Sequence, residues 1–139
     1  MVLALAGIAA ILMLKNAARE AQSRLVGQEC GNQLVRLSFA SMMWLQQINT
    51  ENYPEEFSQM FDIVGSPKGL FCPADQGRTV VRDWSRFEEG MATYEIVSPG
   101  VPFTETNAVF VRCPIHGHVI RADGFVYEQS GKRFEKGVW

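Results

Sequence analysis

Apolar residues occupy the first fourteen positions of the chain, Met1 to Leu14, without a single charge. The pattern then becomes amphipathic, with Leu14, Ala18, Ala21 and Leu25 three or four positions apart, which predicts an α-helix. A second stripe follows after a shift of one position and comprises Cys30, Leu34, Leu37, Ser41 and Leu45. One helix to about Gln47 would be roughly 70 Å long, so its apolar half is expected to protrude. Gly27 and Gly31 lie where a bend or a loosened turn is expected.

Shorter elements are predicted from Tyr53 onward. Pro54 to Val64 has helical spacing and ends at Gly65, a favoured residue after a helix. The segments ATYEIV, AVFVRC, HVIRA and FVYEQ alternate like short antiparallel strands, and Asp123-Gly124 is a strong turn signal. Trp84 and Phe87 are the expected buried residues of the ambiguous segment before them. The pattern predicts an α+β fold with a long helix in residues 1–50 and a small head in residues 51–139.

Composition narrows the classes of protein. The chain has 139 residues, a formal net charge of −2 and 47% hydrophobic residues, which is ordinary for one globular domain. No basic stripe is present in the sequence, so a nucleic-acid partner is not expected. Fourteen apolar residues are too few to span a bilayer, and the first basic residue, Lys15, follows the run, unlike in a signal peptide. A buried core helix is one interpretation of the run, and part of a helix that packs in lipid or among identical helices is another.

The order of the motifs provides a resemblance to a known family. The apolar run is followed by AREAQSRLVGQECGNQLVRL, and then by FCPAD, ATYEIVSPG and RCPIHGHVIRADG. Over nearly its whole length the chain resembles the type IV pilin-like proteins, in particular the major pseudopilins of type II secretion systems. The resemblance implies a long protruding N-terminal helix packed on a small antiparallel sheet. It also implies a structural subunit of a helical filament of identical chains, and not an enzyme.

The same resemblance implies an assembly pathway. The precursor would be cut by a prepilin peptidase and methylated, held in the inner membrane, and passed by an inner-membrane assembly platform into a periplasmic or extracellular filament. The expected assembly core comprises Met1, Leu3, Leu5, Gly7, Ile8, Ile11, Leu12, Leu14, Ala18, Ala21 and Leu25. The chain departs from the family pattern at Leu5, where a glutamate is usual, and at Asn16, where a proline is often found. The alternative is a membrane-anchored periplasmic binding or metal-carrying module that does not polymerise.

Three cysteines require an explanation in redox terms. Disulfides persist in an exported head, and Cys72 and Cys113 each precede a proline. We expect these two to form a disulfide, with Cys30 to Cys72 as the next pairing. On its helix face Cys30 is most simply a small hydrophobic residue.

Metal binding and catalysis are the competing functions for these residues. Cys113, His116 and His118, together with Cys72, could supply zinc ligands. The sequence has no C-x-x-C pair and no H-x(3–5)-H pair, so neither a metal nor another cofactor is expected. Its acidic residues are scattered, unlike those of a calcium loop. No P-loop, G-x-S-x-G or dinucleotide motif occurs, and we expect no enzymatic activity.

Overall fold

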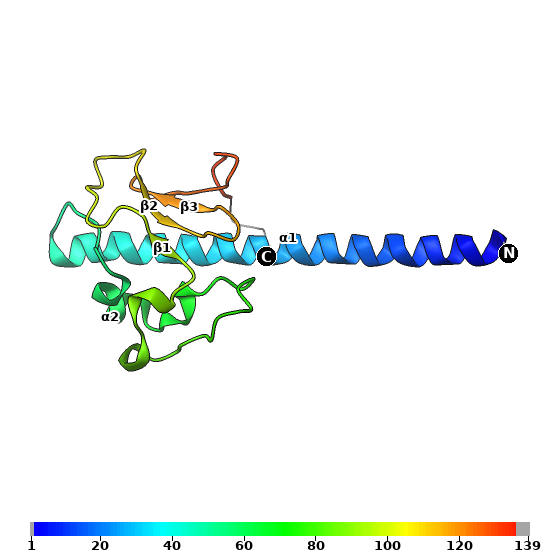
Figure 1. Ribbon diagram of the computed structural model, residues 1–139. Coiled ribbons are helices and arrows are strands. Elements are labelled where there is room, and N and C mark those ends of the chain that lie inside the picture. Colours follow the sequence, from blue (N-terminus) through cyan, green and yellow to red (C-terminus); the bar gives the residue numbers. More distant parts are fainter. Residues whose placement is uncertain (1, 136–139) are drawn as a thin grey trace.

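The long helix predicted from the sequence is the dominant element of the fold. The computed structural model describes residues 2–135, and helix α1 runs over Val2–Ile48, 47 residues. At 1.5 Å per residue this is about 70 Å. The second half of α1 lies in the head and the first half projects from it (Figure 1). Helix α1 continues through Gly27 and Gly31 without the loosened turn that was expected there.

A four-stranded antiparallel sheet lies on one side of α1. Strands β1 (Glu95–Ile96), β2 (Val109–Arg112), β3 (Val119–Arg121) and β4 (Val126–Tyr127) follow one another in space in chain order. The predicted turn at Asp123-Gly124 joins β3 to β4, and Gly124 has the positive φ of +83° that such a turn requires. The α+β class predicted from the sequence is thereby confirmed.

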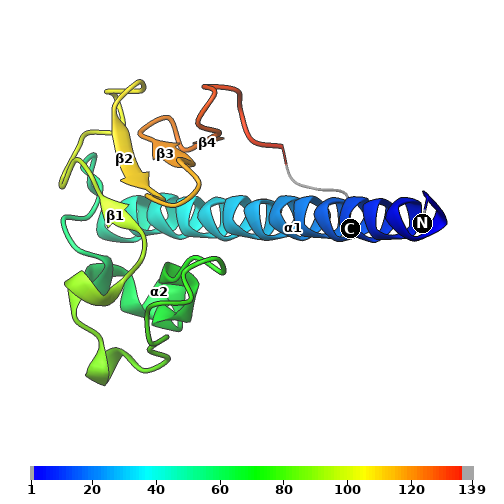
Figure 2. The same cartoon turned by 45° about the vertical axis from the view of Figure 1, so that its right-hand side comes forward.

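Short helical turns cover another side of α1 (Figure 2). A 3-10 helix at Phe57–Met60 leads into α2 (Phe61–Val64), and further 3-10 helices lie at Pro67–Leu70, Trp84–Arg86 and Glu89–Met91. The sequence predicted a helix from Pro54, but the helical turns begin only at Phe57. The side-chain oxygen of Gln59 accepts hydrogen bonds from the backbone of Glu55 and Glu56, at 2.7 and 3.0 Å. These bonds hold the two residues in an extended lead into the turn.

The buried stripe of α1 lies in the centre of the head. Cys30, Leu34 and Leu37 are at most 4% exposed, which confirms the second stripe as the core face. They belong to one cluster with Phe57 and Met60 from the helical turns and with Phe110, Val111 and Ile120 from the sheet. Trp84 and Phe87 are only partly buried and pack edge to face at the margin, with ring centroids 5.0 Å apart.

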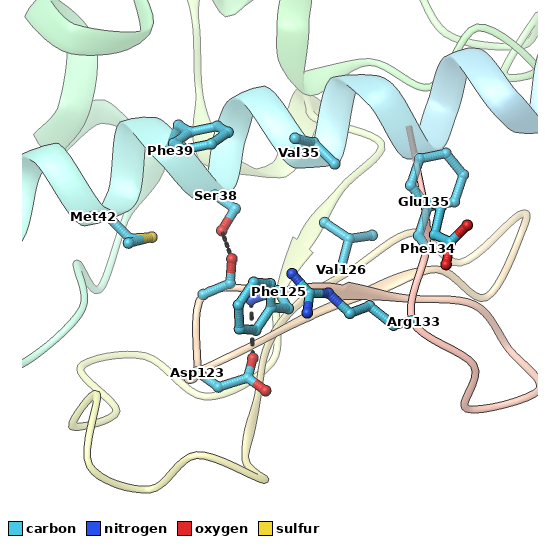
Figure 3. A pocket seen from close by; sticks show the side chains of 11 residues that line it. Val35, Ser38, Phe39, Met42, Asp123, Phe125, Val126, Arg133, Phe134 and Glu135 are labelled. Carbon is cyan, nitrogen blue, oxygen red and sulfur yellow. Dashed lines mark hydrogen bonds between the residues drawn. The ribbon is translucent and has the colours of Figure 1, made fainter. Parts of the chain in front are cut away.

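Helix and sheet meet along a seam at the β3–β4 turn. The Ser38 hydroxyl donates a hydrogen bond to the Gly124 carbonyl at 2.6 Å, and the Tyr53 hydroxyl donates one to the Ala122 carbonyl at 3.0 Å. A hollow of about 500 Å³ lies beside the first bond and is lined on the helix side mainly by apolar side chains (Figure 3). The Ser38 bond fixes the turn against α1, and the Tyr53 bond fixes the end of β3 against the segment that follows α1.

Two of the glycines of α1 lie against aromatic rings of the head. A Cβ atom at position 31 would lie 2.2 Å from the ring of Phe134, so only glycine lets that ring lie against the helix backbone. A Cβ atom at position 27 would be 3.7 Å from the ring of His116. Close packing therefore requires glycine at position 31, whereas a Cβ at position 27 would be in ordinary van der Waals contact with His116.

The projecting part of α1 corrects the predicted location. Every side chain described between Ala6 and Leu25 is exposed. Within the described residues, no helix has an apolar stretch long enough to cross a membrane. Lys15, Arg19 and Glu20 follow directly after the apolar run. The resemblance implied a chain held in the inner membrane before it enters a periplasmic or extracellular filament. This predicted location was therefore wrong.

Candidate metal centre

Four side chains with metal-binding atoms meet where α1 enters the head. The Sγ atoms of Cys30, Cys72 and Cys113 and a ring nitrogen of His116 all lie within 4.8 Å of one another. Cys30 comes from α1, Cys72 from the loop after the 3-10 helix Pro67–Leu70, and Cys113 and His116 from the turn between β2 and β3. Three segments that are distant in sequence thus contribute to one cluster.

The loop that carries Cys72 is held by its own polar contacts. The backbone N–H of Asp75 donates to the Cys72 carbonyl at 2.9 Å, which closes a tight turn over Pro73. The Asp75 carboxylate accepts a hydrogen bond from Thr93 at 2.8 Å and pairs with Arg78 at 2.9 Å. This turn presents the Cys72 sulfur to the interior, where the residue is 3% exposed.

The β2–β3 turn carries two members of the cluster. The backbone N–H of Cys113 donates to the His118 carbonyl at 2.8 Å, and the N–H of Gly117 donates to the Cys113 carbonyl at 2.9 Å. Gly117 has a φ of +71°, a conformation that favours glycine. The turn therefore places the His116 ring beside the Cys113 sulfur and next to Gly27 of α1.

The distances from the His116 ring to two of the sulfurs suit a tetrahedral metal site. The His116 Nδ1 atom lies 3.3 Å from the Cys72 sulfur and 3.8 Å from the Cys113 sulfur. Zinc binds sulfur at about 2.3 Å and nitrogen at about 2.0 Å, so two corners of its tetrahedron are roughly 3.6 to 3.8 Å apart. These two nitrogen–sulfur distances are therefore close to the spacing that zinc requires, and all four ligand atoms lie within 4.8 Å of one another.

Hydrogen bonding and burial distribute the negative charge unevenly over the thiols. A hydrogen bond from the Cys30 thiol, together with the backbone N–H of His116, lowers the pKa of Cys113 to about 5. The hydrogen bond with Cys113 also raises the pKa of Cys30, and burial is the second largest cause of this rise. Burial raises the pKa of Cys72 to about 11. The cluster thus favours a thiolate at Cys113, which is the form that binds metals.

Tyr94 places a buried hydroxyl group beside the cluster. Its hydroxyl lies 2.8 Å from the Gln33 side-chain oxygen and 3.6 Å from the Cys30 sulfur. Burial raises the pKa of Tyr94, which keeps the hydroxyl protonated as a donor. Cys30 and Cys113 are fully buried. The three sulfurs are therefore shielded from water, while His116 is partly exposed, and four protein ligands suit a structural centre better than one with an open position for a substrate.

The cluster differs from the metal alternative considered from the sequence. His118 is not a member of the cluster; its ring stacks on that of His116 with centroids 5.6 Å apart. Cys30 takes its place, although its position on the helix had suggested only a small hydrophobic residue. A signal was present in Cys113-x-x-His116, whose spacing equals that of a C-x-x-C ligand pair. Cys72 and Cys113 are free thiols in this structure, and their disulfide stays a prediction.

Apart from Met1, the predicted assembly residues belong to the projecting part of α1. Gly7, Ile8, Ile11, Leu12, Leu14, Ala18, Ala21 and Leu25 are exposed there. Met1 and the side chains of Leu3 and Leu5 lie outside the described residues.

Comparisons with known proteins leave the site to be interpreted from its geometry. No protein-family model, no curated protein and no solved structure matches this chain.

Proposed function

We propose that this chain is a structural, non-catalytic subunit of a helical filament, similar to a type IV pilus or a type II secretion pseudopilus. In this proposal the fold is pilin-like, and the partners are further copies of the chain. The projecting half of α1 packs against the same segment of neighbouring copies. The heads remain on the outside of the polymer.

The observation that carries the proposal is the exposure of apolar side chains all around α1. The four consecutive side chains from Ile11 to Leu14 are 54% to 72% exposed. Consecutive residues differ by about 100° around a helix, so these four face every direction. A single partner helix would cover one stripe only. Several neighbours are needed to cover such a surface, and a filament core of identical helices supplies them.

Small residues support close packing of these helices. The small residues Ala6, Gly7, Ala9 and Ala10 form two pairs separated by Ile8. No atom outside the helix lies within 4 Å of a Cβ built at Gly7. Small side chains let helix backbones approach one another closely. The charged residues begin at Lys15, nearer the head, where neighbouring helices would be more widely separated.

The proposal is tested by the assembly of the purified full chain. Sedimentation over a range of concentrations, with electron microscopy of the pellet, should show regular filaments of the wild type. Ile11→Asp should stay in the supernatant with a folded head, because a carboxylate would be buried without a partner in an apolar bundle. Gln76→Asp adds the same charge at an exposed loop position of the head, outside the proposed helix core, and should assemble. Filaments formed by Ile11→Asp would contradict the proposal.

A further inference from the structure

We propose that Cys30, Cys72, Cys113 and His116 bind one zinc ion, which fastens α1 to both sides of the head. The inference rests on the ligand cluster alone and is independent of filament assembly. It concerns a site for a divalent metal that the sequence pattern does not predict.

The chemistry of the four ligands selects the metal. Thiolate sulfur and imidazole nitrogen favour zinc over calcium and magnesium, which prefer oxygen ligands. Four protein ligands complete a tetrahedron and leave no position for water or substrate. His116 binds through Nδ1, the atom that faces the sulfurs of Cys72 and Cys113. Its proton is then on Nε2. Each thiol that is still protonated releases its proton to solvent when its sulfur binds the ion.

The surroundings supply what a buried thiolate centre needs. Three thiolates and one zinc ion leave a net charge of about −1, which requires donors around the sulfurs. Backbone N–H groups of Ala74, Ile115 and His116 favour the thiolate forms of Cys72 and Cys113, because they lower the pKa of these thiols. The Tyr94 hydroxyl lies at the Cys30 sulfur. Such contacts orient the ligands and stabilise the charge.

The position of the centre gives it a mechanical role. Cys30 is five positions beyond Leu25, the last residue of the fully exposed part of α1. The helix therefore meets the metal where it enters the head. Cys72 ties it to the helical turns, and Cys113 and His116 tie it to the sheet. Without the ion, the three segments depend on apolar packing and a few hydrogen bonds to keep this junction closed.

A metal ion and the Cys72–Cys113 disulfide exclude each other, because a sulfur that has formed a disulfide is no longer a thiolate ligand. The chain contains three cysteines and two histidines, so the ligand set can be tested completely. The full chain is purified in reducing buffer, and its metal content is measured by mass spectrometry. Chelator-treated protein is then titrated with Co²⁺, whose visible absorption reports tetrahedral geometry and sulfur ligands.

The expected result is about one zinc ion per chain, and a sulfur-to-cobalt absorption band that zinc abolishes. His116→Asn should weaken zinc binding at least ~100-fold, whereas the matched control His118→Asn should retain the metal. His116→Cys should also retain the metal, since a fourth thiolate replaces the imidazole. This variant shows whether His116→Asn binds zinc weakly because a ligand is missing. Measuring the same variants on an Ile11→Asp background separates this result from assembly.

Four results would overturn the inference. One is a chain without metal or tetrahedral cobalt absorption under reducing conditions. Another is iron in the place of zinc. The third is undiminished binding by His116→Asn. A Cys72–Cys113 disulfide that persists in the purified protein, with no metal bound, would also contradict it and would support the disulfide prediction.

Discussion

The Nδ1 atom of His116 lies 3.3 Å from the Sγ atom of Cys72, although the two residues are 44 positions apart in the chain. Cys72 belongs to the helical turns on one side of α1, and His116 belongs to the sheet on another. The two sides of the head therefore meet at the buried stripe of the helix, beside Cys30. The integrity of this contact decides how firmly the projecting helix is held.

Removal of the metal should loosen the whole head. Structural zinc contributes to folding directly, and a loss of several kcal/mol lowers the midpoint of thermal unfolding by ~10 °C or more in a domain of this size. Circular dichroism melts of the reduced chain, with and without a chelator, measure the shift. Stoichiometric Zn²⁺ should restore the original midpoint. Identical melts under both conditions would contradict a structural role for the ion.

Loss of the Tyr94 hydroxyl should weaken both the metal site and the core. Tyr94→Phe removes the hydrogen bond to Gln33, which leaves a partly buried oxygen without its donor and costs about 1 to 3 kcal/mol. It also removes the polar hydroxyl that lies 3.6 Å from the Cys30 sulfur, so zinc affinity should fall about 10-fold. Urea unfolding and competition with a chelator measure the two effects. Tyr127→Phe, at a partly exposed hydroxyl away from the cluster, should leave zinc affinity unchanged.

Addition of a methyl group at Gly31 should destabilise the head. A Cβ at this position overlaps the Phe134 ring at 2.2 Å, and overpacking of this kind costs about 1 to 3 kcal/mol. Gly31→Ala should therefore unfold at lower urea concentration, although alanine favours the helix by about 1 kcal/mol. On a Phe134→Ala background, the Gly31→Ala substitution should lose most of its destabilising effect, because the ring that it overlaps is gone. Gly69→Ala, with open space around its Cβ, is the control.

Glu89 should contribute to stability through the start of the first helical turn. Its carboxylate accepts hydrogen bonds from the backbone N–H groups of Phe57 and Ser58, at 2.9 and 2.8 Å. Glu89→Ala leaves both donors without this partner and should lower the free energy of unfolding by about 1 to 2 kcal/mol. The exposed neighbour Glu88 provides the comparison, since Glu88→Ala should change stability by less than about 0.5 kcal/mol.

Local patterns predicted the regular elements well. The spacing of Leu34 and Leu37 identified the buried face of α1, and Asp123-Gly124 identified the last turn of the sheet, because both signals depend on neighbouring residues in the sequence. The start of the first helical turn was displaced by a side-chain contact from Gln59. Gly31 was interpreted as a weak point of the helix. The need for glycine there comes from the ring of Phe134, which is more than a hundred residues away in the sequence.

The metal cluster could be predicted only in part for the same reason. Cys113 and His116 are three positions apart and form a recognisable ligand pair. The approach of Cys72 and Cys30 depends on how two loops dock on α1, which no local pattern specifies. His118 was the wrong histidine, because its ring lies outside the group of sulfurs, stacked on His116 and beside Phe134, with centroids 5.6 and 5.5 Å away.

The most direct test of the filament proposal is cryo-electron microscopy of the polymer formed by the full chain. We predict a helical assembly in which the Ala6 to Leu14 segments of many copies pack together in a dense core, with the heads outside. Single particles at every concentration in the absence of detergent would contradict it. So would a polymer in which these segments remain exposed on the surface.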